Sequence, residues 1–194
     1  MVGDRQQDAG RSADSDETAL IAGVRARDME AFEELYRRYH PRLSRFLTNL
    51  IQRQHLVEEA LNDTMMVVWN RLDSFAGASK LSTWIFAIAY RTAMKAARRQ
   101  DVPVESPAED RRESDGPAPD EGIGRAQVQR ELARAMGALS ADHRSVVDLT
   151  YFHDMGYREI AEIMDCPVDT VKTRMFHARR HLKRQLSGEL ADWM

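Results

Sequence analysis

The residues best suited to chemistry in this sequence form one basic stretch near its end, CPVDTVKTRMFHARRHLKR, which spans residues 166–184. It holds six lysines and arginines and a single acidic residue, Asp169. Ammonium and guanidinium groups bind phosphate oxygens, and arginine also pairs with base edges in the major groove of DNA. The stretch therefore predicts a surface that binds nucleic acid.

The spacing of apolar residues places this stretch in a pair of helices. We expect one helix over about 157–164, a tight turn at 165–167 and a longer helix beyond it. The predicted buried stripe of the longer helix consists of Val168, Val171, Met175, Ala178 and Leu182. Helices joined this closely form a candidate helix-turn-helix, whose second helix enters the major groove. An ordinary helical hairpin with a solvated basic face fits the same pattern.

The polar side chains of the longer helix divide into two predicted roles. At 100° per residue, one group points away from the core and is placed to read bases, while a second group lies beside it and is placed for phosphates. The base-reading candidates are Thr170, Thr173, Arg174 and His177, and the phosphate candidates are Lys172, Arg179, Arg180, Lys183 and Arg184.

The net charge of −3 hides an uneven distribution of its 28 basic and 31 acidic residues. Acidic residues gather in segments 1–20 and 101–125, and outside these segments 23 basic and 18 acidic residues remain. The parts expected to fold thus have the basic excess of a nucleic-acid binder. No apolar run of about 18 residues is present, so we expect no membrane span and a cytoplasmic protein. The single cysteine, Cys166, excludes an internal disulfide.

A proline-rich acidic segment divides the chain. We expect an all-α fold of two small helical domains joined by a flexible acidic linker, because this segment has almost no large apolar side chains and cannot form a core. The predicted divisions are a disordered acidic tail at 1–19, a helical domain at 20–100, the linker at 101–124, a second helical domain at 125–187 and a C-terminal tail at 188–194.

The first predicted domain contains an amphipathic helix with an unusual outer face. Its buried stripe advances through Val57, Leu61, Met65, Val68 and Leu72. The outer stripe on the opposite side consists of Glu59, Asn62, Asp63 and Met66. On pattern alone, a solvated face is the favoured interpretation of this outer stripe.

A second helix of this domain is expected to begin at an N-cap, Ser82 or Thr83, and to bury Ile85, Ile88 and Ala89 together with Trp84. Its far end is basic, with Arg91, Lys95, Arg98 and Arg99 and no acidic residue between them. Such an end suits a phosphate backbone. Favourable interaction with the helix dipole is the alternative, and it explains one or two of these charges better than four.

The residues of both halves together resemble one known family. The stretches AFEELYRRYHPRLSRFL, NDTMMVVWNRLDSF and STWIFAIA resemble region 2 of extracytoplasmic-function (ECF) sigma factors. The stretch from residue 139 to residue 184, LSADHRSVVDLTYFHDMGYREIAEIMDCPVDTVKTRMFHARRHLKR, resembles their region 4. The resemblance implies a bacterial transcription initiation factor that directs core RNA polymerase to promoter DNA. Region 2 would then open and read the −10 element, and region 4 would read the −35 element.

The resemblance also implies roles for particular residues. The outer stripe would bind the coiled coil of the polymerase β′ subunit, region 4 would meet the β flap, and an anti-sigma factor would control the protein. The loop residues Ser74, Phe75, Ala76, Gly77, Ser79 and Lys80 would capture a flipped base of the −10 non-template strand, and Trp84, Arg91, Lys95, Arg98 and Arg99 would lie along that strand. Arg91 departs from the family, which commonly has Asn at this position.

Other classes of protein fit less of the chain. A stand-alone helix-turn-helix regulator leaves the region 2 pattern unused and would bind a palindrome as a dimer. His177 and His181 lie four residues apart near Cys166, but the sequence offers no fourth zinc ligand at a suitable spacing. We therefore expect no metal, no cofactor and no enzymatic activity, with His181 on the surface. His143 and His153 have no evident partner in the sequence.

Overall fold

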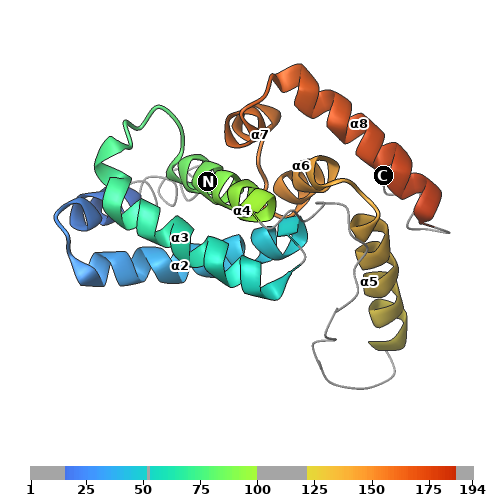
Figure 1. Cartoon of the computed structure of the whole chain (residues 1–194), viewed down its shortest axis with the longest axis horizontal. Helices are drawn as coiled ribbons and strands as arrows, with labels where there is room; N and C mark the ends of the chain where they lie inside the picture. The colour runs from blue at the N-terminus through green and yellow to red at the C-terminus, as the bar shows by residue number, and fades with distance from the viewer. Residues whose placement is uncertain (1–15, 52, 100–121, 187–194) are drawn as a thin grey trace, which may run out of the picture.

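The computed structural model describes residues 16–51, 53–99 and 122–186, and every regular element in these ranges is helical. A helix over residues 16–25 precedes α2 (Met29–Ile51), α3 (Gln54–Arg71), the short 3₁₀ helix η1 (Leu72–Ser74) and α4 (Leu81–Arg99). The chain continues through α5 (Gly122–Gly137), α6 (Ala141–Tyr151), α7 (Tyr157–Met164) and α8 (Val168–Gln185) (Figure 1). The expected all-α fold is confirmed.

We call the helices up to α4 the first domain. In this domain, α3 packs against both α2 and α4. All five predicted stripe residues of α3 are buried, although Leu72 belongs to η1 rather than to α3. The expected N-cap at Ser82 or Thr83 is wrong, because α4 begins at Leu81, which is itself fully buried. The predicted tail at 1–19 is also too long. Residues 16–25 are helical because Leu20 and Val24, one turn apart, both reach the core.

The helices from α5 onward, which we call the second domain, contain the predicted helix-turn-helix. The bounds of α7, the turn and α8 match the sequence-based expectation. Asp165 ends α7 in the left-handed conformation, at φ 49°, and the backbone N–H of Cys166 donates to the carbonyl of Ala161. This sharp reversal sets the angle between the two helices. Four of the five stripe residues of α8 are buried, and Val168 is half-buried.

The second domain begins earlier than the sequence predicted. Helix α5 begins at Gly122, inside the segment 101–124 that was assigned to the linker. The remainder of that linker and the C-terminal tail at 188–194 lie outside the described residues, as does the first part of the N-terminal tail.

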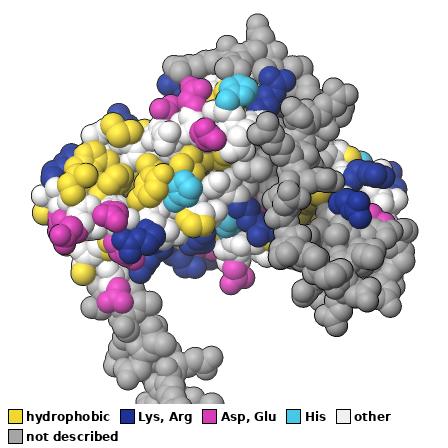
Figure 2. All heavy atoms as spheres, turned by 90° about the horizontal axis from the view of Figure 1, so that it is seen from below, with side chains coloured by type: hydrophobic (Ala, Val, Ile, Leu, Met, Phe, Trp, Pro, Cys, Tyr) yellow, Lys and Arg dark blue, Asp and Glu magenta, His cyan; other side chains and the backbone are white. Residues whose placement is uncertain are grey.

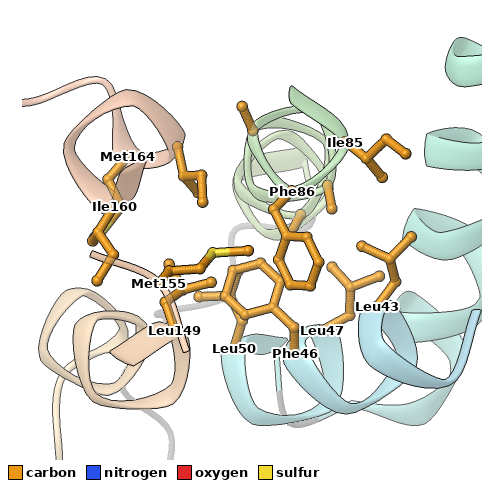
Figure 3. Close-up of a cluster of buried hydrophobic side chains, with 14 of the residues drawn as sticks. Leu43, Phe46, Leu47, Leu50, Ile85, Phe86, Leu149, Met155, Ile160 and Met164 are labelled. Carbon is orange, nitrogen blue, oxygen red and sulfur yellow. The ribbon is translucent and has the colours of Figure 1, made fainter. Parts of the chain in front are cut away.

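The two domains dock on each other and share one core. Helix α4 packs on α7 and helix α2 packs on α6, so that segments far apart in sequence lie side by side (Figure 1). The close-up in Figure 3 shows Phe46, Leu50 and Phe86 of the first domain facing Leu149 and Met155 of the second. Ile160 and Met164 of α7 complete this junction. The sequence predicted two domains but not their docking.

The shared core predicts a large stability loss when Phe86 is truncated. Phe86 is fully buried, and its ring centroid lies 5.3 Å from that of Phe46. Phe86→Ala should lower the free energy of unfolding by about 3–5 kcal/mol, because it leaves a cavity as well as losing apolar contacts. Urea denaturation followed by circular dichroism measures this loss. The control Met29→Ala changes a side chain that is 66% exposed and should be nearly neutral, and equal effects of the two variants would contradict the shared core.

Candidate nucleic-acid and polymerase interfaces

The base-reading candidates of α8 are not equally free. Thr173 and His177 are exposed, whereas Thr170 and Arg174 are half-buried. Arg174 forms an ion pair through Nη2 with Asp142 of α6, and its Nη1 lies 3.6 Å from Cys166 Sγ. The expectation that all four side chains point away from the core is therefore wrong for Arg174. It lies only about 60° around the helix from Val171, at the edge of the exposed face.

The phosphate candidates of α8 are all exposed, namely Lys172, Arg179, Arg180, Lys183 and Arg184. Lys172 pairs with Asp169 one turn earlier, with 2.9 Å between Nζ and Oδ1. Arg179 donates to the hydroxyl oxygen of Tyr151, with its Nη2 at 2.6 Å. Both pairs lie on the surface, where such contacts contribute little to stability, so these cations remain available to a phosphate backbone.

Phe176 is a potential contact that the sequence analysis missed. Its side chain is 62% exposed on α8, and its ring packs edge-on against His177, with 5.4 Å between centroids. It lies about 140° around the helix from Val171, and that angle could have identified it. An exposed phenyl ring among cations can contact the methyl group of thymine in a major groove.

The histidines of this region have partners that the sequence did not reveal. His143 Nδ1 lies 3.0 Å from Ser140 Oγ, and the His143 ring centroid lies 6.3 Å from that of His177. Burial, followed by the nearby His177, lowers the pKa of His143. His181 is half-buried with its Nε2 enclosed, so its assignment to the surface is wrong. Within the described ranges, no three His, Cys, Asp or Glu side chains are grouped to hold a metal ion.

The outer stripe of α3 is fully available in this structure. Glu59, Asn62, Asp63 and Met66 are all exposed, and Met66 is 59% exposed. One turn beyond Met66, the half-buried Trp69 packs on Phe32 of α2 with 4.8 Å between ring centroids. Figure 2 shows hydrophobic side chains gathered in one patch on the side of the molecule formed by the first domain. A mixed surface of carboxylate, amide and thioether groups suits a protein partner better than DNA.

The loop between η1 and α4 is anchored at its start and open at its centre. Phe75 is buried against Trp84, with 5.6 Å between ring centroids, and Arg25 donates to the carbonyl oxygens of Leu72 and Phe75. Ser74, Ala76 and Gly77 are exposed, and Gly77 has a φ of 71° that favours glycine. The open centre, rather than Phe75, is the part that a base could enter.

The loop ends at a contact with the second domain. Lys80 Nζ lies 2.9 Å from Glu159 Oε1 of α7, and Ser79 beside it is half-buried. The hydrogen bond with Glu159 and its charge raise the pKa of Lys80. Burial alone would raise the pKa of Glu159, but hydrogen bonds from Gly156 N–H, Lys80 and Thr83 hold that pKa below its usual value. The pair is therefore ionised at neutral pH and ties the loop to α7.

The basic end of α4 is exposed to solvent, as a surface that binds phosphates must be. Arg91, Lys95 and Arg98 are exposed, and Trp84 at the other end of the helix is half-buried. The side chain of Arg99 lies outside the described residues.

In the part of the chain that the structure describes, no helix is long and apolar enough to cross a membrane.

Comparisons with known proteins match each of the two domains to a family model. The family model for sigma-70 region 2 matches residues 35–102, and the model for sigma-70 region 4 matches residues 129–182. The chain belongs to the sigma-70 family, as an ECF sigma factor. The first domain therefore contains sigma region 2, and the second contains sigma region 4.

Relatives that are ECF sigma factors align with most of the chain. The chain is 28% identical over 178 residues to the ECF RNA polymerase sigma-E factor of Haemophilus influenzae, covering 87% of this chain and 94% of the relative. It is 29% identical over 180 residues to the ECF sigma factor RpoE of Cereibacter sphaeroides, covering 89% and 98%.

Two solved structures share the fold. RpoE of Bartonella quintana, in complex with the anti-sigma factor NepR, has a TM-score of 0.62 at 27% identity over 83% of this chain and 99% of that chain. CnrH, in complex with the cytosolic domain of CnrY, has a TM-score of 0.61 at 22% identity over 86% and 94%, and it supports the fold alone.

The geometry of α8 predicts that its base-reading candidate Arg174 and its phosphate-binding candidate Lys183 affect DNA binding in different ways. Arg174→Ala should weaken binding to a −35 duplex by about 1–3 kcal/mol and relax base preference, if Arg174 leaves Asp142 to pair with a base. The matched variant Lys183→Ala should weaken binding to all duplexes alike and reduce the salt dependence. Fluorescence anisotropy against specific and scrambled duplexes at several salt concentrations measures both effects. Unchanged affinity and selectivity of Arg174→Ala would remove it from the base-reading group.

Proposed function

We propose that this ECF sigma factor binds core RNA polymerase through the outer stripe of α3 and directs it to promoters through two separate DNA contacts. The observation that carries the proposal is the pair of exposed surfaces on the two matched regions. Region 2 presents Asn62, Asp63 and Met66 to solvent on one helix, while region 4 presents a basic recognition helix. A protein-binding face and a DNA-binding face in one chain fit a factor that connects polymerase to a promoter.

The −10 contact is proposed to lie at the loop before α4. The exposed residues Ala76 and Gly77 form its open centre, and the basic residues Arg91, Lys95 and Arg98 follow along α4. A single strand needs a positively charged track for its phosphates and a place for an unstacked base. The loop and the basic end of α4 offer these two features in the order of the chain.

The −35 contact is proposed to lie at α8. Thr173 and His177 would face base edges, while Lys183 and Arg184 at the end of the helix would bind phosphates. Phosphate contacts fix the position of the helix on the duplex, and base contacts select the sequence. Region 4 would also meet the β flap of polymerase, as expected from the resemblance.

An anti-sigma factor is the proposed regulator. The solved structure of RpoE from Bartonella quintana contains the anti-sigma factor NepR. This neighbour is similar in sequence and in fold, which supports a partner of the same class for our chain. We further propose that the protein acts in the cytoplasm, without a cofactor and without catalysis of its own, because each proposed contact is non-covalent binding.

A stand-alone helix-turn-helix regulator is disfavoured. It would account for residues 129–182, but the match of residues 35–102 to sigma-70 region 2 would then have no function. The two possibilities differ in whether polymerase binds the chain directly.

Charge reversal at Asp63 tests direct binding to polymerase. Asp63 is exposed, so Asp63→Lys should melt near the wild-type temperature. A like charge at a charged contact costs several kcal/mol, so the affinity for core polymerase should fall about 100-fold or more. Competition against a fluorescent primary sigma factor measures this affinity.

The control for this experiment is Glu162→Lys, which makes the same charge change at an exposed position of α7. It should bind core polymerase as the wild type does. Undiminished binding by a folded Asp63→Lys protein would remove the α3 stripe from the interface. An absence of core binding by the wild-type protein would contradict the proposed function itself.

A further inference from the structure

Helix α6 contacts the two flanks of α8 in chemically different ways. Near the start of α6, Asp142 forms an ion pair with Arg174, which lies about 60° around α8 from Val171. At the end of α6, Tyr151 accepts hydrogen bonds from Arg179, which lies about 80° from Val171 on the other side. One flanking guanidinium group is therefore paired with a carboxylate and the other with a neutral hydroxyl group.

The contact between Arg179 and Tyr151 uses only one edge of the guanidinium group. Nε lies 3.0 Å and Nη2 lies 2.6 Å from Tyr151 Oη, and Cζ lies 5.7 Å from the centroid of the tyrosine ring. A guanidinium group has five N–H donors, so those of Nη1 and the second one of Nη2 are left for another acceptor. These donors form the fork that binds two oxygens of a carboxylate or a phosphate.

The hydroxyl group of Tyr151 also has a proton left to donate. Its oxygen accepts from two guanidinium nitrogens, so the O–H bond points away from them. In the described part of the chain, no oxygen accepts this proton in a hydrogen bond. Tyr151 is 47% exposed and Arg179 is exposed as well, so an acceptor from outside the chain can reach both groups.

The pair suits an acceptor with a full negative charge. The charge of Arg179 is not offset, because its partner is neutral, whereas the carboxylate of Asp142 offsets the charge of Arg174 and would repel an anion. The end of α6 is the negative end of a helix dipole, which disfavours an anion, and the guanidinium group beside it counters that effect. A phosphate group fits both donors, since its neighbouring oxygens can take the guanidinium fork and the hydroxyl proton.

The position of the pair matches the place where phosphates would lie around α8. A helix with its side chains is about 10–12 Å across and the major groove is about 12 Å wide, so each flank of a helix in the groove meets a phosphate backbone. Lys172 and Lys183 lie about 100° and 120° around α8 from Val171, on the same side as Arg179. All three cations are exposed. The flank that includes Tyr151 is therefore basic along its length.

We propose that Tyr151, at the end of α6, is a DNA-binding residue that together with Arg179 binds one phosphate group of the −35 duplex. This inference rests on the proposed −35 contact and adds to it a residue from outside the helix-turn-helix. The hydroxyl group donates one hydrogen bond, and the free fork of Arg179 donates two more. Because Tyr151 belongs to a second helix, this contact restrains the sliding and rolling of α8 in the groove more than a contact from α8 alone.

The first test removes the hydroxyl group of Tyr151 alone. Tyr151→Phe should melt near the wild-type temperature, because the side chain is exposed. It should weaken binding of the full chain to a duplex with the −35 element of a transcribed promoter about tenfold, because a hydrogen bond to a charged group is lost. The salt dependence should stay unchanged, because no charge is removed, whereas Arg179→Ala should weaken binding and lower the salt slope by about one. Fluorescence anisotropy at several salt concentrations measures these effects.

The control for this test is Tyr36→Phe, the same change at a half-buried position of α2. Tyr36 lies in region 2, outside the proposed −35 contact, so this variant should bind the duplex as the wild type does. Equal or tighter binding by Tyr151→Phe than by the wild type would show that the hydroxyl group only holds Arg179, and would overturn the proposal.

The second test locates the phosphate group. A methylphosphonate replaces one charged phosphate oxygen with a methyl group, and a series of duplexes contains it at one position at a time. Several positions should each weaken binding of the wild-type protein. At one of them, the loss caused by Tyr151→Phe should shrink from about tenfold to less than about twofold, because the charged acceptor is already gone. The loss caused by Arg179→Ala should shrink at the same position.

The distribution of these losses separates a local contact from an effect on the fold. A loss in Tyr151→Phe that stayed tenfold at every methylphosphonate position would overturn the proposal, because no single phosphate would then depend on the hydroxyl group. If the wild-type protein bound the −35 duplex no better than a scrambled duplex, the proposed −35 contact itself would be wrong and the inference would fall with it.

Discussion

Burial of apolar side chains at one junction determines how this sigma factor is arranged. Phe46 and Phe86 of region 2 meet His153, Leu149 and Met155 of region 4 in a single continuous core (Figure 3). Each domain alone is small, and small domains bury a limited fraction of their surface. Docking lets each domain use the other to cover apolar faces that would otherwise meet water. The position of the two proposed DNA-binding surfaces relative to each other follows from this contact.

At the same junction, some of the proposed binding surfaces stay exposed, whereas another is in contact with the opposite domain. The α3 stripe and most of α8 remain exposed, whereas Lys80 is paired across the junction. A second polar link joins Tyr90 of α4 to Asp142 of α6, with 3.2 Å between Oη and Oδ1, and burial followed by Asp142 raises the pKa of Tyr90. Since Asp142 also holds Arg174, a contact of region 2 is connected to a proposed base-reading residue of region 4. The domains are thus coupled by polar links as well as by apolar packing.

Local patterns predicted the helices and the exposed surfaces, but not the contacts between domains. The repeat of Val57, Leu61, Met65 and Val68 identified the buried side of α3, and Pro167 with Asp165 marked the turn before α8. Nothing in the spacing of Phe46 or Phe86 could show whether the same domain or the other one covers them. Asp148 and His153 are polar, and nothing in the sequence indicated that they would be buried. Their burial could be recognised only from contacts made across the junction, such as the hydrogen bond that Asn49 donates to Asp148. Arg174 was expected to be free because Asp142, its partner, lies 32 residues away in another helix.

The most direct test of the central claim, that this chain directs polymerase to promoters, is run-off transcription on a library of genomic fragments. Purified core polymerase with the wild-type protein would be compared with core polymerase alone. We expect a discrete set of transcripts only when the protein is present, from fragments that share two sequence elements at a constant spacing. A transcript profile identical to that of core polymerase alone would contradict the account.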